Sequence, residues 1–572
     1  MSASTCDLLV IGAGAGGLAA AVTAAFHGLS VIVAEKTETF GGTTAWSGGW
    51  LWIPGNPLAR AAGIVEDTDA PRRYLRHELG NQFDAARIDA FLRHGPRMVD
   101  FFARETAVQF IAGNAIPDFH GASPGAAEGG RSVCAAPFDG RALGPLLARL
   151  RPPLDEIAPF GMGIASGTDL GHFLKFGRSW RSSVHVARRV ARHLLDRARA
   201  GRGLHLVNGN ALAARLGKSA VDRGVELRFA APAQRLLLEG GRVCGAVLGG
   251  PGGESEVRAR CGVVLACGGF PHDRARIAAL FPHAPDGSAH WSAAPPTNTG
   301  DGLRLAEAVG AAVETAYPDA GAWAPVSLVP HRDGHIGTFP HLIERAKPGV
   351  IAVTAAGRRF ANEADAYHDV MRALFRAVPP GQEVAAWLIC DRRFLRRYGL
   401  GAVRPAPVPH GAHLRSGYLR RGATVAALAA ACGIDAAALA DTLATYNRDA
   451  AHGEDPEFGR GRTPYNRVQG DPAQHPNPCV APIAAPPFHA VKLVPGSLGT
   501  FAGLRTDADA RVLDAAARPI PGLYAAGNDM ASIMGGHYPS GGITLGPAMT
   551  FGYIAARHAA GIADAAGAAA AA

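Results

Sequence analysis

A chain of 572 residues is long for a single hydrophobic core, so its length predicts two or more domains. Hydrophobic residues make up 48% of the chain and charged residues 18%, which excludes an intrinsically disordered protein. The net charge of +9 permits weak attraction to anionic surfaces, but no pattern indicates a nucleic-acid partner. The eight cysteines show no CxxC pair and no metal-ligand spacing, so we expect neither disulfides nor a bound metal.

The N-terminal segment has the pattern of a βαβ unit that binds a dinucleotide. Residues 6–11 predict a buried strand, an alanine-rich helix follows to about His27, and residues 30–34 predict a second strand. Four glycines with GxGxxG spacing separate the first strand from the helix: Gly12, Gly14, Gly16 and Gly17. Such glycines permit a tight turn and let a pyrophosphate approach the helix N-terminus. Glu35, at the end of the second strand, is the expected acceptor for ribose hydroxyls.

The same N-terminal run is apolar from Leu8 to Phe26 and could be mistaken for a targeting segment. It lacks the basic flank of a signal peptide, and four glycines interrupt it. We therefore expect a cytoplasmic protein.

A second glycine-rich stretch, residues 40–49, follows directly after Glu35 and Lys36. In flavoproteins with two dinucleotide-binding domains such a stretch runs beside the pyrophosphate and ribityl chain of FAD, and here it resembles the fumarate reductase and ketosteroid dehydrogenase group. The contacts that this resemblance implies are Lys36, Gly42, Thr43, Thr44, Ser47, Gly48 and Gly49. Relatives with a covalent flavin have a histidine in this region, whereas residues 40–52 contain none. We therefore expect non-covalent FAD.

Three later segments indicate the same cofactor. Residues 262–270 predict a strand that ends in a turn near the nucleotide. Residues 522–529 repeat this pattern of a strand followed by glycine, at the place where the chain of such flavoproteins returns to cover the flavin. The loop at 535–549 leads into a helix whose N-terminal dipole can stabilise a reduced flavin. The expected contacts in these segments are Ala266, Gly268, Gly527, Asn528, Gly542, Thr544 and Leu545.

Since both chain ends converge on one cofactor, the middle of the chain must be an insertion. We predict an α/β fold with a Rossmann-like FAD-binding domain at residues 1–275 and 485–572, and an inserted α+β cap domain at residues 276–484. The pocket between these domains is the expected substrate site. No second strand-GxGxxG-helix unit is found, so we expect an external electron acceptor other than NAD. The alanine-rich tail from Ala560 is expected to be frayed.

The chain resembles the 3-ketosteroid dehydrogenases, especially the 1-dehydrogenases, within the fumarate reductase and succinate dehydrogenase flavoprotein superfamily. The most specific stretch is residues 524–553, YAAGNDMASIMGGHYPSGGITLGPAMTFGY. In that family a tyrosine and a glycine N–H of this loop bind the 3-carbonyl oxygen, and the matching residues are Tyr538 and Gly542. Two donors on a carbonyl stabilise an enolate. Loss of a proton from C2 and of a hydride from C1 to flavin N5 then yields the double bond.

The proton requires a base. Residues 357–367 resemble the family motif GxRFxNExxxY, whose tyrosine takes the substrate proton, and its match is Tyr367. A free tyrosine has a pKa near 10, so Tyr367 needs a neighbouring donor or a proton relay. The family tyrosine that assists this base is replaced by Phe119. His120 is a candidate for the missing hydrogen bond; an ordinary loop histidine, a mechanism without this bond and attack at another ring position are the alternatives.

Fumarate-type reductases share the expected fold but bind a dicarboxylate through arginines and histidines, typically in HGxNRLGG and HxTxGG motifs. The matching places here read HYPSGGITLG and PGSLGT, which leaves little to neutralise a doubly charged substrate. We therefore predict FAD-dependent desaturation of ring A of a 3-ketosteroid or a similar fused-ring ketone. The alternatives are a 3-oxo-5α-steroid 4-dehydrogenase, a reductase of an unsaturated acid and a flavin-binding protein without turnover.

A basic segment at residues 172–202 has Phe173, Phe176, Trp180 and Val184 at helical spacing. We interpret it as a solvated helix packed by its apolar stripe. A helix that lies on a membrane surface is the alternative.

Overall fold

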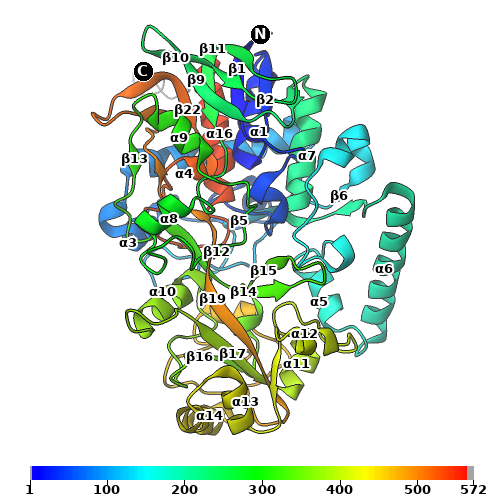
Figure 1. The fold of residues 1–572 in the computed structure, drawn as a ribbon. Coiled ribbons are helices and arrows are strands. Elements are labelled where there is room, and N and C mark those ends of the chain that lie inside the picture. The colour runs from blue at the N-terminus through cyan, green and yellow to red at the C-terminus, as the bar shows by residue number, and fades with distance from the viewer. Residues whose placement is uncertain (1–2, 563–572) are drawn as a thin grey trace.

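The computed structural model describes residues 3–562, so most of the tail that was expected to fray lies outside the described residues. The described chain forms two lobes, each built on its own β-sheet (Figure 1).

Parallel strands form the centre of the sheet in the first lobe. In spatial order they are β22 (Pro519–Ala525), β11 (Ser255–Leu265), β1 (Ala3–Ile11), β2 (Val31–Ala34) and β8 (Glu226–Arg228). Helices cover both faces of such a sheet, and its inner strand β2 accordingly has the fully buried sequence VIVA. The antiparallel strands are β9 (Ala233–Glu239), β10 (Arg242–Leu248) and β21 (Arg511–Leu513). The predicted α/β class is confirmed.

Helices from both chain ends pack together in this lobe. Helices α7 (Asn208–Asp222) and α16 (Leu545–Ala559) pack against α1 (Ala15–Phe26). Helix α4 (Ala85–Glu105) packs against α16. A Cβ on Gly552 of α16 would lie 2.3 Å from the carbonyl oxygen of Gly16, so this crossing requires glycine. The contact brings the last helix directly onto the first βαβ unit.

The second lobe has a largely antiparallel sheet. Its main strands are β15 (Ile336–Pro340), β14 (Gly321–Pro330), β19 (Phe488–Thr500), β17 (Ala386–Asp391) and β16 (Val350–Val353) in spatial order. The long strand β19, orange in Figure 1, lies in the middle of this sheet among green and yellow segments. It begins just after residue 485, the position at which the sequence predicts that the chain returns to the FAD-binding domain. The division into two domains stays a prediction.

A buried ion-pair cluster fixes the segments that carry the site in the second lobe. Arg359 pairs with Glu363 and with Asp455, both at 2.8 Å, and Arg460 also pairs with Glu363 at 3.1 Å. All four side chains are buried. The cluster ties the loop before α10 (Tyr367–Ala377) to the segment before α15 (Pro464–Gln469).

The basic segment forms two helices, α5 (Thr168–Leu174) and α6 (Trp180–Ala200), with α6 along one side of the molecule (Figure 1). The break follows from Gly177, whose φ is +75°, and from Ser179, whose side chain accepts a hydrogen bond from the N–H of Ser182 at 3.4 Å. The side chain of Trp180 is 76% exposed, so the prediction of one helix packed through this residue was wrong. Contact with a membrane surface stays a prediction. Within residues 3–562, no helix is long and apolar enough to cross a membrane.

Candidate active site

The predicted glycine loop connects β1 to α1. A Cβ on Gly17 would lie 2.0 Å from the carbonyl oxygen of Gly12, so glycine is required for close packing of helix on strand. Gly14 differs, because the nearest atom to a Cβ there is Thr44 Oγ1 at 3.9 Å. Gly14 thus leaves open space at the N-terminus of α1, where backbone N–H groups lack intrahelical acceptors and favour an anion.

This open space belongs to a cavity of about 2160 Å³ that extends between the lobes. Typical small-molecule sites measure roughly 300–1,000 Å³, so the cavity has room for a dinucleotide and a second ligand. All predicted cofactor residues except Gly17 line it, as do Tyr367 and Tyr538; His120 does not. The predicted cofactor residues in the wall are Gly12, Gly14, Gly16, Glu35, Lys36, Gly42, Thr43, Thr44, Ser47, Gly48, Gly49, Ala266, Gly268, Gly527, Asn528, Gly542, Thr544 and Leu545.

The predicted cofactor residues of the cavity wall form a nucleotide cradle. Two buried side chains that the sequence analysis missed join its segments. Asp529 accepts hydrogen bonds from the N–H groups of Cys267 at 2.5 Å and Gly269 at 2.9 Å, and so joins β22 to the turn after β11. Asn298 donates to Thr43 Oγ1 at 2.9 Å and to the carbonyl oxygen of Gly268 at 3.1 Å. Burial raises the pKa of Asp529, and the two amide donors act against this shift.

The acidic and basic residues after β2 have partners within the protein. The Glu35 carboxylate accepts hydrogen bonds from the N–H groups of Ala13 and Thr37, both at 3.0 Å, and still lines the cavity. Lys36 pairs with Asp301 at 2.5 Å. The open face of Gly14, the carboxylate of Glu35 and the size of the cavity fit FAD.

One loop supplies two hydrogen-bond donors to the cavity wall. Gly542 has a φ of +97°, and its carbonyl oxygen accepts a hydrogen bond from the N–H of Trp52 at 3.1 Å. The N–H of Gly542 has no acceptor among the residues that the structure describes. Tyr538, four residues earlier, is buried and lines the same cavity. A phenol and a free amide on one wall suit a carbonyl oxygen.

Tyr367, the first residue of α10, lies against Tyr538. Their ring centroids are 4.9 Å apart and the rings are nearly perpendicular, at 78°. Burial, followed by the proximity of Tyr538, raises the pKa of Tyr367 well above 10. Burial also raises the pKa of Tyr538 to about 12, although hydrogen bonds with Tyr367 and Thr544 lower it. The structure therefore brings together the predicted base and the predicted donor.

Phe119 lies among three tyrosines. Its ring centroid is 5.6 Å from that of Tyr367, 5.8 Å from that of Tyr538 and 4.4 Å from that of Tyr465. Its N–H donates to the carbonyl oxygen of Pro539 at 3.0 Å, which fixes this segment to the donor loop. Phe119 thus packs at the position where the family pattern has a third phenol.

The side chain of His120 binds two carboxylates. Its Nδ1 contacts the carboxylate of Glu78, and its Nε2 lies 2.7 Å from Asp369 Oδ2. Burial lowers the pKa of His120, but the hydrogen bonds to Asp369 and Glu78 outweigh it and raise the pKa to about 10. Both ring nitrogens have carboxylate partners, so this arrangement gives Tyr367 no hydrogen bond from His120.

Tyr465, in α15, is a site residue that the sequence analysis missed. Its side chain is buried and lines the cavity, and burial raises the pKa of its hydroxyl above the usual value. The Pro464 that precedes it marks a helix start in the sequence, but nothing local to Tyr465 indicates contact with Phe119.

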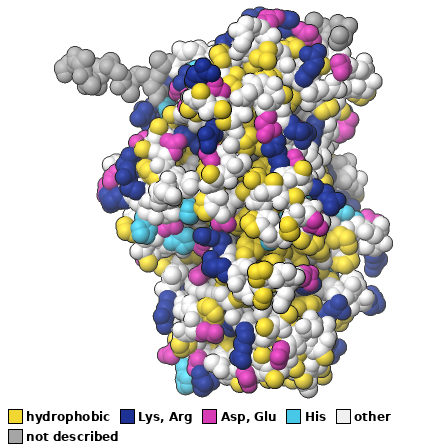
Figure 2. Space-filling model, turned by 60° about the vertical axis from the view of Figure 1, so that its left-hand side comes forward, with side chains coloured by type: hydrophobic (Ala, Val, Ile, Leu, Met, Phe, Trp, Pro, Cys, Tyr) yellow, Lys and Arg dark blue, Asp and Glu magenta, His cyan; other side chains and the backbone are white. Residues whose placement is uncertain are grey.

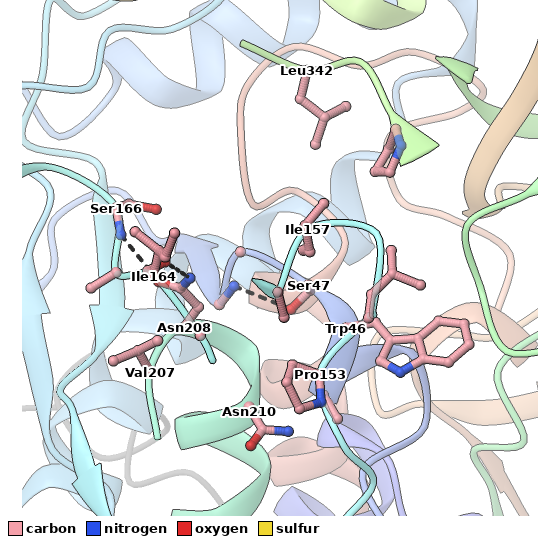
Figure 3. Close-up of a pocket in the computed structure, with 18 of the residues that line it drawn as sticks. Trp46, Ser47, Pro153, Ile157, Ile164, Ser166, Val207, Asn208, Asn210 and Leu342 are labelled. Atoms are coloured by element: carbon pink, nitrogen blue, oxygen red, sulfur yellow. Dashed lines mark hydrogen bonds between the residues drawn. The ribbon is translucent and has the colours of Figure 1, made fainter. Parts of the chain in front are cut away.

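Beside the glycine-rich loop the cavity widens into an apolar compartment (Figure 3). Ile157, Val207 and Leu342 line it, with Leu342 contributed by the second lobe. Asn208 braces its wall, since its Nδ2 donates to the carbonyl oxygen of Ile164 at 2.8 Å. Hydrophobic side chains also gather along the middle of the face shown in Figure 2, between the lobes. Such walls suit an apolar ligand.

The nucleotide cradle, together with the donors Tyr538 and Gly542 beside it, indicates that the protein is a flavin-dependent dehydrogenase. The chain matches the FAD binding domain family over residues 7–545. It is 40% identical to 4-oxocyclohex-2-ene-1-carboxylate 5-dehydrogenase of Sinomonas cyclohexanicum, over 98% of this chain and 94% of the relative. It is 36% identical to a 3-oxosteroid 1-dehydrogenase of Mycobacterium tuberculosis, over 99% of this chain and 100% of the relative.

A solved structure gives the same result. The 3-ketosteroid delta1-dehydrogenase from Sterolibacterium denitrificans, in complex with 1,4-androstadiene-3,17-dione, has a TM-score of 0.90 and 37% identity, covering 98% of this chain and all of the other. The chain therefore belongs to the FAD-dependent 3-ketosteroid dehydrogenase family and is an FAD-dependent oxidoreductase.

Proposed function

We propose that this enzyme removes two hydrogens from adjacent ring carbons of a cyclic ketone, whose oxygen binds Tyr538 and Gly542. The observation that carries the proposal is the free N–H of Gly542 on the wall that also presents Tyr538. Donors that are already in place stabilise an enolate without reorganisation when the charge develops.

Tyr367 is the proposed base for the proton next to the carbonyl. Its ring contact with Tyr538 supports this role, because a carbonyl bound to Tyr538 would have its acidified carbon near Tyr367. FAD, which we infer to be bound non-covalently, supplies the hydride acceptor when bound. The N-terminal end of α16, at Thr544 and Leu545, faces the cavity and favours negative charge there.

Tyr465 is the proposed assistant of Tyr367. It contacts Phe119 from a different helix, and besides burial its proximity contributes to the raised pKa of Tyr367. A phenol at this place compensates for the phenylalanine that stands where the family pattern has a tyrosine.

The Mycobacterium and Sterolibacterium relatives support a 3-ketosteroid as the substrate, with desaturation of ring A at C1–C2. The apolar compartment around Ile157 and Leu342 supports a fused-ring substrate as well. The electrons then pass to an external acceptor other than NAD.

A smaller cyclic oxo acid is the second candidate substrate. The Sinomonas relative, which is 40% identical, is named for a six-membered ring ketone that carries a carboxylate. Both candidates present one ketone to the same pair of donors.

Turnover of purified enzyme with an artificial electron acceptor tests the proposal. The compounds compared are a 4-ene-3-ketosteroid, a 5α-saturated 3-ketosteroid, 4-oxocyclohex-2-ene-1-carboxylate and, with a reduced dye, fumarate. We expect oxidation of a ketone and no reduction of fumarate. Oxidation of only the 5α-saturated steroid would indicate a 4-dehydrogenase, whereas fumarate reduction, or bound FAD without any turnover, would contradict the proposal.

A further inference from the structure

Lys347 lies in the cavity wall of the second lobe without an acidic partner. Its ammonium donates to the carbonyl oxygens of Gln469 at 2.6 Å and Gly470 at 2.7 Å, at the C-terminal end of α15. Both acceptors are neutral, and residues 3–562 place no carboxylate within ion-pair distance of Lys347. An ammonium has three N–H donors, so one remains available.

The nearby carboxylates are already paired. Asp471 forms an ion pair with Arg397 at 2.6 Å and accepts a hydrogen bond from the hydroxyl of Tyr398 at 2.6 Å, and Glu344 contacts His341. Burial lowers the pKa of Lys347, and the charges of Asp471 and Glu344 only partly offset this shift. An anionic ligand would remove that cost.

Helix α15 connects Lys347 to the reacting end of the cavity. Tyr465 lies four residues before Gln469, which corresponds to about 6 Å along a helix. The ring of Tyr465 contacts Phe119, and Phe119 lies against Tyr538. A ring ketone held by Tyr538 and Gly542 can therefore direct its opposite end along α15 towards Lys347.

We propose that Lys347 binds a carboxylate at the end of the substrate opposite the ketone, so that the enzyme acts on cyclic oxo acids. The proposal rests on the proposed function for the position of the ketone. A charge-assisted hydrogen bond from the free N–H supplies affinity, and the neutral carbonyls of Gln469 and Gly470 hold the ammonium in place.

The test compares Lys347→Met and Lys347→Arg with the wild-type holoenzyme on 4-oxocyclohexanecarboxylate and its methyl ester. Lys347→Met should raise the KM for the acid on the order of 10- to 100-fold, since a hydrogen bond to a charged group is lost. The KM for the ester should change less than about threefold, and Lys347→Arg should retain much of the affinity for the acid. Lys175→Met removes the same charge at an exposed position of the same cavity and should leave both values unchanged.

Binding without turnover separates this proposal from the proposed function. Titration of the oxidised Tyr367→Phe holoenzyme, in which flavin reduction should be slow, with the acid should perturb the flavin absorbance, and adding Lys347→Met should weaken that binding by a similar factor. Equal losses for acid and ester would mean that Lys347 only caps α15, and unchanged binding of the acid would also overturn the proposal. Tight, Lys347-dependent binding of the acid to the enzyme with Tyr367 intact, without flavin reduction, would instead reject the dehydrogenase mechanism.

Discussion

The two ends of the cavity are built in different ways. At the ketone end, one loop presents Tyr538 and the amide of Gly542, and main-chain hydrogen bonds fix this loop to Trp52 and Phe119. At the opposite end, the wall includes single side chains, among them Leu342 and Lys347 of one second-lobe segment and Ile157 of the first lobe. In the proposed function, backbone geometry would determine where the carbonyl is held, whereas individual side chains would determine what the rest of the substrate can be.

Removal of the base should have the largest effect if the ketone end performs the chemistry. Tyr367→Phe should slow flavin reduction by about 10³-fold, since a positioned general base contributes roughly 10²–10⁴. The FAD content should stay normal, because Tyr367 lies on α10, outside the nucleotide cradle. Anaerobic stopped-flow absorbance measures both, and a normal reduction rate would place the base elsewhere.

Loss of one carbonyl donor should have the next largest effect. Tyr538→Phe should lower kcat by about 10²-fold, because the Gly542 amide still holds the ketone oxygen. Steady-state assays with matched FAD content measure this change. If only KM rose, Tyr538 would bind the substrate without stabilising the enolate.

A smaller effect is expected where the two ends meet, at Tyr465. In the wild type, reduction should accelerate as the pH rises, because burial holds the pKa of Tyr367 well above 10 and only the phenolate accepts a proton. Tyr465→Phe should slow reduction by about tenfold and displace the rising limb to higher pH. A uniform loss across the pH range would assign Tyr465 a packing role only.

His120 should affect stability and leave turnover nearly unchanged. Its pKa in the folded state is raised to about 10, so its ion pairs stabilise the fold fully below its unfolded pKa near 6.5, and this contribution is lost as the pH rises towards 10. His120→Gln should therefore lower the Tm at pH 6 and have little effect at pH 10. A fall in turnover comparable to that of Tyr367→Phe would restore the catalytic role that the sequence suggested.

The same contrast explains what could be predicted from the sequence. Gly14 is found by a local pattern, because a strand, a glycine turn and a helix must follow one another in the chain for such a site to form. Gly542 is found through the resemblance of its loop to the loop of a known family. Lys347 and Tyr465 have no such pattern, since their roles arise from contacts between distant segments. The partners of His120, Glu78 and Asp369, likewise come from two different helices.

A crystal structure of the FAD-loaded enzyme with an unsaturated ring ketone product would show directly whether Tyr538 and Gly542 bind the carbonyl. We expect the ketone oxygen to lie about 3 Å from both the hydroxyl of Tyr538 and the amide nitrogen of Gly542. A ketone bound away from this loop, with Tyr538 and Gly542 facing only solvent, would contradict it.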